Sequence, residues 1–232
     1  MISTLVLLAG GMATRLRPVT EKIPKSMLEV AGKPFILHQL DLLKKNNISK
    51  VIICASYLGE FIKEYLRKNH FHDLEIKYSF DGDRLLGTGG AVKKALSLLE
   101  DNFFVMYGDS YLNTDFQKIN EYFFSNNKSG LMTVYRNEGK YDKSNIIFED
   151  HQILSYDKNN FDDKMKYIDY GLGILTKKSF IDFADKNEFD LEEVYKNLLK
   201  KNELLGFEVK ERFYEIGSFE GLEETNKFLS KE

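Results

Sequence analysis

The sequence predicts an α/β fold, in which a mostly parallel sheet carries helices on both faces and a small antiparallel extension follows. Short β-branched runs alternate with amphipathic stretches over the first half of the chain, which is the order of parallel βαβ units. The first run, LVLLAG, is continuously apolar and does not alternate, as expected of a strand covered on both faces. In the second half, strand-like runs are separated only by short turns, which is typical of antiparallel pairing.

Strands and helices of the first half each have a local signal. Pro34 suits the first turn of a helix, where the backbone N–H has no partner to lose, and apolar residues follow it at helical spacing. A glycine pair opens the third helix. We expect strands at 5–10, 51–56, 74–80 and 102–110 and helices at 34–47, 58–69 and 89–100.

After Gly130 the runs become shorter and more strand-like. They predict an antiparallel extension that lies over the sheet as a lid or platform. Strand-like runs occupy 131–137, 144–150, 152–158 and 165–175, followed by helices at 177–185 and 190–200, a strand pair at 204–210 and 212–217, and a last helix at 219–231. Because there is no repeat, low-complexity tract or long polar linker, we expect one domain.

Composition narrows the possible partners and the compartment. With 232 residues, 43% of them hydrophobic, the chain can build one sizeable core, and a net charge of −3 gives no reason to expect a nucleic-acid partner. The single cysteine, Cys54 in the apolar run VIICAS, is expected to be a buried core thiol, which suits a reducing compartment. No signal-peptide pattern and no apolar run of about 20 residues is present, so we expect a cytoplasmic protein with no membrane partner.

The stretch LLAGGMATRLRPVTEKIPKSM, at 7–27, is a long basic loop that directly follows the first strand. A dinucleotide fingerprint would need a third glycine and a helix, but Pro18 stands where that helix should be established, and no helix can pass through both Pro18 and Pro24. The P-loop pattern is also absent. What remains is a loop at the carboxyl end of a parallel strand, where open α/β sheets bind ligands.

This loop has the residue types of a phosphate cradle. Gly10 and Gly11 allow backbone N–H groups to approach an anion closely, and Arg15 and Lys25 can reach over the same point. A solvated basic loop is the simpler alternative, and it is the interpretation that we prefer for the remaining cations, Arg17 and Lys22.

The opening stretch and five later motifs resemble one enzyme family in their order. The stretch continues to LLAGGMATRLRPVTEKIPKSMLEVAGKPF, and the later motifs are LLGTGGA at 85–91, YGDSYLNTD at 107–115, SYDK at 155–158, IDYGLGI at 168–174 and YEIGSFEGL at 214–222. The chain resembles the sugar-1-phosphate nucleotidyltransferases, or NDP-sugar pyrophosphorylases. It is most similar in appearance to their small bacterial members of the heptose-1-phosphate guanylyltransferase type. The resemblance covers nearly the whole chain and stops before any β-helix acyltransferase domain.

This resemblance implies a Rossmann-like sheet and a single nucleotidyltransferase domain. Residues from about 1 to 129 would bind the nucleotide, and those from about 130 to 232 would bind the sugar and close the site. The implied reaction joins an NTP to a sugar 1-phosphate and releases pyrophosphate. GTP with D-glycero-D-manno-heptose 1-phosphate or mannose 1-phosphate is the favoured pair. The implied partners are these small molecules, and the chain would act as a monomer or homodimer.

The resemblance also assigns roles to individual residues. Arg15 and Lys25 would be catalytic, with Arg15 on the β- and γ-phosphates and Lys25 between the reacting phosphates. Nucleotide-binding residues would be Leu8, Ala9, Gly10, Gly11, Thr88, Gly89 and Gly90. Sugar-phosphate-binding residues would be Asp157, Lys158, Asp169, Gly171 and Gly173. Asp109 and Glu215 would hold Mg²⁺, or Mn²⁺ in its place.

Some of these residues have an ordinary structural alternative. Asp109 follows the strand FFVMY, where a carboxylate can bind a hard cation beside phosphates, although a lone aspartate at a strand end is more often a turn or cap. The opening loop favours the metal. The glycines of LLGTGGA can bind a nucleotide or merely form a tight strand-to-helix connection, and for Gly87 these two interpretations are equally open. The YDK triplet can likewise be a simple turn.

Two residues depart from the family pattern. Ala13 stands where glycine is usual, which limits positive φ in the loop. Glu215 stands where aspartate is usual, so the carboxylate is kept but its reach is one methylene longer.

Other functions remain open from the sequence. A cytidylyl- or uridylyltransferase for another sugar 1-phosphate or for a phospho-alcohol would share the opening loop. A non-catalytic nucleotide-sugar sensor or regulatory subunit could dispense with Lys25, Asp109 and Glu215. This chain keeps all three charges, which favours the enzyme.

Overall fold

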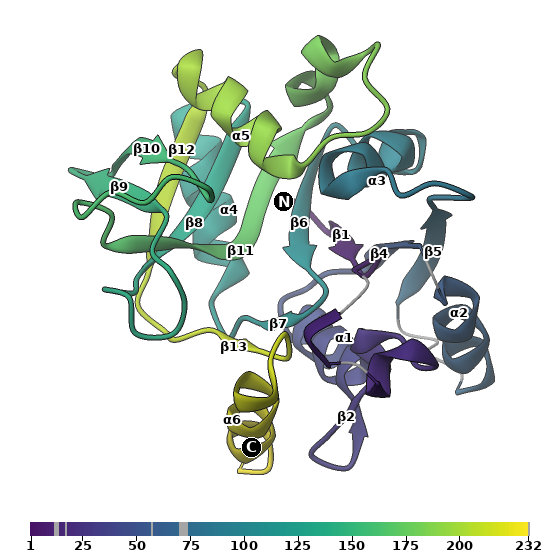
Figure 1. The fold of residues 1–232 in the computed structure, drawn as a ribbon. Coiled ribbons are helices and arrows are strands. Elements are labelled where there is room, and N and C mark those ends of the chain that lie inside the picture. Colours follow the sequence, from purple (N-terminus) through teal and green to yellow (C-terminus); the bar gives the residue numbers. More distant parts are fainter. Residues whose placement is uncertain (12–13, 17, 57, 70–73, 232) are drawn as a thin grey trace.

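A computed structural model of the chain describes residues 1–11, 14–16, 18–56, 58–69 and 74–231. In this part of the chain one nine-stranded sheet runs through the molecule (Figure 1). Its strands are β1 (Thr4–Leu8), β4 (Lys50–Ala55), β5 (Glu75–Phe80), β6 (Asn102–Tyr107), β8 (Gly130–Arg136), β9 (Ile146–Glu149), β10 (Gln152–Tyr156), β11 (Tyr167–Thr176) and β12 (Leu204–Val209). They follow the order β10-β9-β11-β6-β1-β4-β5, with β8 pairing both β11 and β12. The predicted fold class is confirmed.

Helices and short strands complete the molecule. The α-helices are α1 (Phe35–Lys45), α2 (Gly59–Lys68), α3 (Gly87–Ala95), α4 (Phe116–Asn126), α5 (Leu191–Lys200) and α6 (Phe219–Leu229). The 3-10 helices are η1 (Thr14–Leu16), η2 (Val19–Glu21), η3 (Lys25–Met27), η4 (Leu96–Leu98) and η5 (Lys177–Phe183). Two small ribbons pair β2 (Glu29–Val30) with β3 (Lys33–Pro34) and β7 (Ser110–Tyr111) with β13 (Tyr214–Glu215). No helix in the described ranges is both long and apolar enough to cross a membrane.

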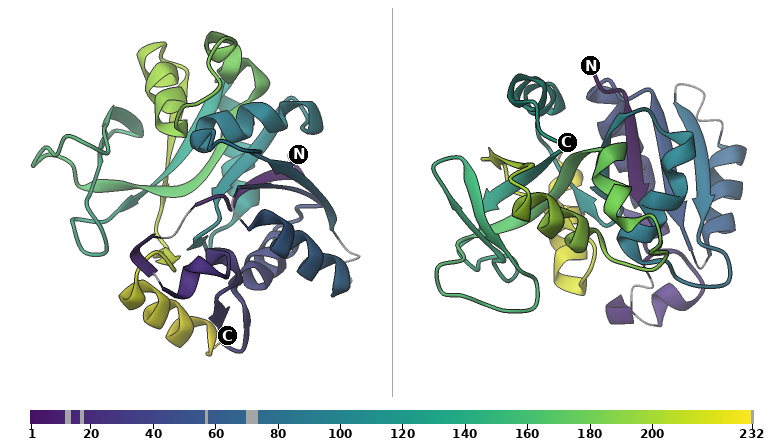
Figure 2. Two further views of the ribbon diagram at one scale, coloured as in Figure 1. Left: turned by 45° about the vertical axis from the view of Figure 1, so that its right-hand side comes forward. Right: turned by 90° about the horizontal axis from the view of Figure 1, so that it is seen from above.

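Strand β1 shows why helices cover both faces of the sheet. All five of its residues are buried, although their side chains alternate between the faces. Leu5 and Leu7 belong to the core cluster that also contains the apolar faces of α1, α2 and α4. Val6 and Leu8 belong to the cluster that contains those of α3 and α5 (Figure 2). A continuously apolar strand is therefore explained by burial on both sides.

The antiparallel half extends the sheet edge to edge, and the expectation that it lies over the sheet as a lid or platform is wrong. Strand β11 is ten residues long, so it can pair with β6 along Leu172–Thr176 on one edge and with β8 on the other. Strand β12 then adds parallel to β8. The predicted strand pair at 204–210 and 212–217 is also wrong, because β13 pairs antiparallel with β7 in a separate ribbon.

Two helical segments differ from expectation. Helix α4 was not predicted, although Asp115 caps it by accepting from the amides of Gln117 and Lys118, and Phe116 and Ile119 are buried at helical spacing. The segment predicted as a helix at 177–185 forms the 3-10 helix η5, in which residues three apart share a face.

Helix α6 covers the short ribbon β2–β3, far from it in sequence. The backbone N–H of Ala31 donates to Asn226 Oδ1 at 2.7 Å, and Val30, Phe35, Tyr111 and Ile216 form a third core cluster with this helix. Because the ribbon directly follows η3, the last helix supports the loop that carries Lys25.

The thiol of Cys54 is buried on β4, as predicted, and its Sγ donates to the carbonyl oxygen of Ala91 at 3.6 Å. Burial, assisted by the charge of Asp81, raises the pKa of this thiol from 9.0 to about 12. We therefore expect native protein to resist labelling by a disulfide reagent at pH 8 and to react fully once unfolded.

The same shift predicts a pH effect on stability. Above about pH 9 the thiol ionises in the unfolded chain and stays protonated in the folded one, so the free energy of unfolding falls as pH rises through this range. Urea unfolding at pH 8 and pH 10 measures the fall, and Cys54→Ala should show a smaller one. Rapid stoichiometric labelling of native protein would contradict the prediction.

Candidate active site

A cavity of about 320 Å³ opens at the carboxyl ends of the parallel strands. Its walls come from Leu8–Gly11 after β1, Cys54 on β4, Asp81 after β5, and the turn after β6. This is the edge at which open α/β sheets bind ligands. The end of β5 lies three strand positions from the end of β6, a span of roughly 14 Å at normal strand spacing.

A second cavity, of about 910 Å³, lies beside the first on the antiparallel side of the sheet. It is lined by polar and aromatic side chains that include Asn145, Lys158, Asp169, Tyr141 and Phe161. Among the residues that the structure describes, the two cavities share three lining residues, which are Lys25, Tyr107 and Asp109. A group in one cavity can therefore meet a group in the other at these three side chains.

Lys25 and Asp109 form an ion pair at this junction. The Nζ of Lys25 donates to Asp109 Oδ2 at 2.8 Å, and the two side chains are 14% and 41% exposed. Pro24 caps η3 with φ of −58° and ψ of 143°, and its carbonyl oxygen accepts from the amide of Met27 at 2.8 Å. Because the next two residues, Ser26 and Met27, are buried, the backbone of Lys25 is fixed on both sides.

Backbone contacts from three parts of the fold hold the turn that carries Asp109. The amide of Gly108 donates to the carbonyl oxygen of Leu8 at 2.9 Å, and no room exists there for a Cβ. The fully buried Gln39 of α1 donates to the carbonyl oxygen of Ser110 at 2.9 Å. The amide of Ile216 donates to the carbonyl oxygen of Asp109 at 2.9 Å.

Glu215 lines the second cavity together with Lys25 and Asp109. Its carboxylate accepts hydrogen bonds from the amide of Gly217 and, at 2.8 Å, from the hydroxyl of Ser218. Any Cβ at position 221 would collide with this carboxylate, so Gly221 makes room for the longer side chain at the start of α6.

These carboxylates are of the kind that a magnesium ion binds. Mg²⁺ uses one or two protein carboxylates and completes its shell with phosphate oxygens and water. Asp109 and Glu215 supply hard oxygen donors in one cavity, and their backbones are neighbours through the β7–β13 ribbon. No group of three or more His, Cys, Asp or Glu side chains gathers in the described residues, as an all-protein metal cage would require.

The glycines of the opening loop line the first cavity, as do Leu8 and Ala9. The amide of Ala9 donates to the carbonyl oxygen of Cys54 at 2.8 Å, whereas the amides of Gly10 and Gly11 have no partner among the described residues. Arg15 is exposed and lines the second cavity.

The loop also departs from the sequence-based expectation of a helix-free segment. It contains the single 3-10 turns η1, η2 and η3, and none of them passes through both Pro18 and Pro24. Ala13 and Arg17 lie outside the described residues.

The LLGTGGA turn divides into cavity-lining residues and packing residues. Gly87 and Thr88 line the first cavity. Gly89 and Gly90, expected at the nucleotide, instead donate their amides to the carbonyl oxygen of Phe189 at 2.9 and 3.1 Å, and a Cβ at either position would collide with the segment before α5. These contacts are those of the tight strand-to-helix connection that the sequence left open as an alternative.

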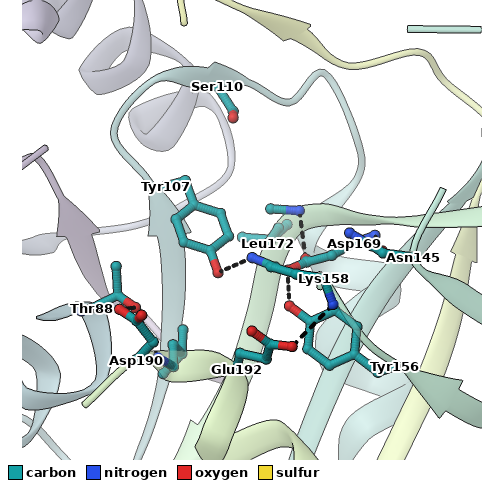
Figure 3. Close-up of polar contacts among 12 residues, drawn as sticks. Thr88, Tyr107, Ser110, Asn145, Tyr156, Lys158, Asp169, Leu172, Asp190 and Glu192 are labelled. Atoms are coloured by element: carbon teal, nitrogen blue, oxygen red, sulfur yellow. Dashed lines mark hydrogen bonds and ion pairs between the residues drawn. The ribbon is translucent and has the colours of Figure 1, made fainter. Parts of the chain in front are cut away.

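Lys158 points into the second cavity toward the junction (Figure 3). Its Nζ lies 3.2 Å from the hydroxyl oxygen of Tyr107 and 3.6 Å from Asp169 Oδ2. Asp169 is 5% exposed and accepts from the hydroxyl of Tyr156 and the amide of Gly171, both at 3.0 Å. Lys158, Asp169 and Gly171 are thus brought together, as the sequence predicted.

The remaining two sugar-side predictions have different outcomes. Asp157 lines the second cavity, but hydrogen bonds from the side chain and amide of Asn160 and the amide of Asn159 engage its carboxylate and hold its pKa well below the usual range. Gly173 does not line this cavity, because its Cα faces the hydroxyl of Tyr195, and a Cβ there would collide with that group.

Tyr107 and Asp81 were not predicted as site residues. Burial, followed by the charge of Asp169, raises the pKa of Tyr107 well above its ordinary value, so this phenol stays protonated between the two cavities. Asp81 is half-buried in the first cavity, and burial raises its pKa also. Both stand at the carboxyl ends of parallel strands, so the rule that identified Asp109 would have found them.

Comparison with known proteins agrees with this geometry. The model of the Nucleotidyl transferase family matches residues 4–232. D-glycero-alpha-D-manno-heptose 1-phosphate guanylyltransferase of Campylobacter jejuni is 33% identical over 214 residues, which cover 91% of this chain and 93% of the relative. The crystal structure of HddC from Yersinia pseudotuberculosis is 27% identical, with a TM-score of 0.84 over 98% of this chain and 100% of the other. The same protein complexed with GMP-PN gives 0.81 over the same shares.

The motifs indicated this family, and the family model and the relative from Campylobacter jejuni match the chain along almost its entire length. The loop of glycines and cations after β1 and the acidic turn after β6 agree with that match. The chain therefore belongs to the nucleotidyl transferase family.

Proposed function

We propose that the protein transfers a guanylyl group from GTP to a manno-configured heptose or hexose 1-phosphate and releases pyrophosphate. The observation that carries the proposal is the Lys25–Asp109 pair at the junction of two cavities. One cavity has the glycine-lined walls that suit a nucleotide, and the other has the cationic and hydrogen-bonding side chains that suit a sugar phosphate. The relative that acts on D-glycero-α-D-manno-heptose 1-phosphate supports this choice of sugar.

The reaction makes one bond at phosphorus and breaks another. An oxygen of the sugar 1-phosphate attacks the α-phosphorus of GTP, and pyrophosphate leaves with the electron pair of the bond that breaks. No general base is required, because a phosphate monoester with a second pKa of about 6 already offers a deprotonated oxygen at neutral pH. The obstacle is repulsion between two polyanions, so the protein must supply cations and fixed positions.

Three groups of the chain would meet this need. Lys25 would place its ammonium between the α-phosphate and the attacking phosphate, where its low exposure limits screening by water. Arg15 would hold oxygens of the departing pyrophosphate with its planar set of donors. The amides of Gly10 and Gly11 would donate to nucleotide phosphate oxygens.

Asp109 and Glu215 would hold a divalent cation, Mg²⁺ or Mn²⁺. When bound, such an ion supplies positive charge that neutralises phosphate oxygens. Asp109 contacts Lys25 directly, so it would also keep the ammonium at the reacting phosphates.

Asp81 supports guanine as the base. Its half-buried carboxylate lines the nucleotide cavity after β5, at the sheet edge distant from the reacting groups of β6. Guanine alone among the common bases presents two adjacent donors, N1–H and N2–H, on its Watson–Crick edge, and a carboxylate can accept both. Burial raises the pKa of Asp81, and within the described residues its carboxylate accepts only a long hydrogen bond, from the amide of Leu86 at 3.4 Å, so two donors of a base would replace water that it has lost.

The sugar would lie in the second cavity. Lys158 would bind its phosphate, and Asp169 and Asn145 offer hydrogen-bonding groups for sugar hydroxyls. Gly171 has φ of +93° and lies against the ring of Tyr107, so the absence of a side chain lets this ring pack close to the backbone beside the junction.

Lys25→Ala tests the cradle. We expect kcat to fall by roughly 10²–10³-fold, the effect of removing one preorganised stabilising group, while nucleotide affinity weakens much less because Arg15 and the glycine amides remain. Lys22→Ala is the matched control, since Lys22 is exposed on the same loop. Pyrophosphate release and equilibrium nucleotide binding measure both quantities. Equal, small effects for the two lysines would favour a non-catalytic sensor.

The metal assignment predicts that EDTA abolishes turnover and that Asp109→Ala loses Mg²⁺ binding as well as activity. Glu215→Gln should lose most activity and weaken Mg²⁺ binding by calorimetry, whereas Glu215→Asp should keep a substantial part. Undiminished turnover in excess EDTA contradicts the assignment. Full activity of the Gln variant would limit Glu215 to supporting the start of α6.

The base assignment predicts that Asp81→Asn relaxes the choice of nucleotide. An amide offers one acceptor and one donor, which match uracil as well as guanine, so the ratio of kcat/KM for GTP over UTP should fall by about 10-fold or more. Asp83→Asn is the control, because Asp83 is exposed on the same connection. An unchanged ratio in Asp81→Asn would move base recognition to another part of the cavity.

The raised pKa of Asp81 adds a pH signature. Because only the ionised carboxylate accepts both donors, KM for GTP should rise as pH falls through this pKa, and Asp81→Asn should show a weaker dependence. A profile shared by wild type and variant would exclude Asp81 as the titrating group.

A further inference from the structure

The first turn of α5 contacts both cavities through three consecutive residues. Asp190 Oδ1 accepts from the amide and the hydroxyl of Thr88, each at 3.2 Å, and the amide of Leu191 donates to Thr88 Oγ1 at 2.8 Å. Glu192, the next residue, accepts from the backbone N–H of Lys158 at 3.0 Å (Figure 3). Thr88 lines the first cavity and Lys158 the second.

Glu192 is well suited to hold the backbone at Lys158. Its side chain is only 14% exposed, and its Oε1 also accepts from Lys196 Nζ at 2.8 Å. Lys196 lies 3.4 Å from Asp157 Oδ1, so both residues of the 157–158 segment are tied to α5. The ion pair with Lys196 thereby helps to hold the carboxylate of Glu192 at the amide of Lys158.

The position of Lys158 in the chain explains why its backbone needs this hydrogen bond. It is the second residue of the ten-residue connection 157–166 between β10 and β11, and most side chains of that connection are exposed. A lysine has four rotatable side-chain bonds, so its ammonium is directed only if its backbone is fixed. The contacts of its Nζ with Tyr107 and Asp169 require that fixed starting point.

We propose that Glu192 is a positioning residue for the sugar-phosphate site. It fixes the backbone of Lys158, while Asp190 and Leu191 fix the same helical turn against Thr88 at the nucleotide cavity. The distance between the two subsites is therefore set by one turn of α5. The proposal rests on the proposed function in one respect, which is that Lys158 binds the sugar phosphate.

The neighbouring Glu193 separates this role from ordinary helix capping. Asp190 and Glu193 form a capping box, in which the amide of Asp190 donates to Glu193 Oε1 at 3.4 Å. Acidic residues in a first turn also favour the helix dipole, and this contribution is common to Glu192 and Glu193. Of these two glutamates, as the structure describes them, Glu192 is the one that accepts a hydrogen bond from Lys158.

The experiment compares Glu192→Ala, Glu192→Gln, Glu193→Ala and Lys158→Ala in the full chain, with GTP and mannose 1-phosphate or D-glycero-α-D-manno-heptose 1-phosphate. Glu192→Ala should raise KM for the sugar 1-phosphate about 10-fold, as expected when a part-buried donor loses its acceptor. The equilibrium Kd for GTP should change less than about 2-fold, since the Thr88 contacts remain. Glu192→Gln should stay within about 3-fold of wild type, because its amide oxygen can still accept from Lys158.

Each outcome has a distinct meaning. Glu193→Ala should lower the melting temperature without changing KM for the sugar 1-phosphate. If Glu192→Ala and Glu193→Ala raise KM equally, or if Glu192→Ala weakens GTP and sugar phosphate alike, Glu192 acts only through helix stability and the inference is overturned. A large effect of Lys158→Ala with none of Glu192→Ala also overturns it and leaves the proposed function intact. No effect of Lys158→Ala would remove the sugar-phosphate assignment itself.

Discussion

The antiparallel pairing of β11 with β6 is the constraint on which the whole site depends. Leu172 lies opposite Met106, so the residues that follow β6 meet those that precede position 172 on β11. Tyr107 and Asp109 are thereby placed beside Asp169 and Gly171. If the neighbouring strand on that edge ran parallel to β6, its opposite end would lie beside the turn that follows β6. The two cavities would then not share a wall. The positive φ of Gly171 belongs to the same arrangement, since the ring of Tyr107 occupies the space beside it.

At this shared wall the charges are few, local and mutually compensated. The chain as a whole is slightly acidic, so the binding of two polyanions cannot rely on a general positive field. Lys25 pairs with Asp109, and Lys158 lies near Asp169 and over the ring of Tyr107. Each cation has a carboxylate partner that fixes its direction while the ammonium remains able to meet a phosphate. The partly buried Tyr107 and the buried Tyr156 and Tyr195 have raised pKa values, so they keep their protons and supply neutral hydrogen-bonding groups around Asp169.

The sequence predicted the parallel half of the fold because its signals are local. Continuous apolar runs, amphipathic helices and glycine turns can each be read over about ten residues, and the carboxyl-end rule then gathers Gly10, Lys25 and Asp109. The antiparallel half was placed wrongly because edge-to-edge pairing of β11 depends on which neighbour accepts it, and no local pattern encodes that choice. Gly89, Gly90 and Gly173 pack against neighbouring elements for a related reason. A glycine near a site can serve the ligand or a neighbouring element, and the contacts with Phe189 and Tyr195 could not be read from the sequence. Glu192 belongs to a helix whose amphipathic pattern was predicted, but its contact with Lys158 crosses 34 residues of sequence.

The support of the opening loop by α6 has a consequence for how the protein matures. Asn226 binds Ala31 across 195 residues of sequence, and Glu215, on β13 just before the same helix, lines the second cavity together with Lys25 and Asp109. The basic loop emerges from the ribosome well before the segment that supports it, because the contact between them spans 195 residues. A nascent chain that already contains the glycines and Lys25 therefore lacks the contacts that hold the opening loop in place. It gains them only when α6 packs against the β2–β3 ribbon. The ability to bind phosphate should thus appear only when the contacts between α6 and the opening region form. Folding of the central sheet alone should not be enough.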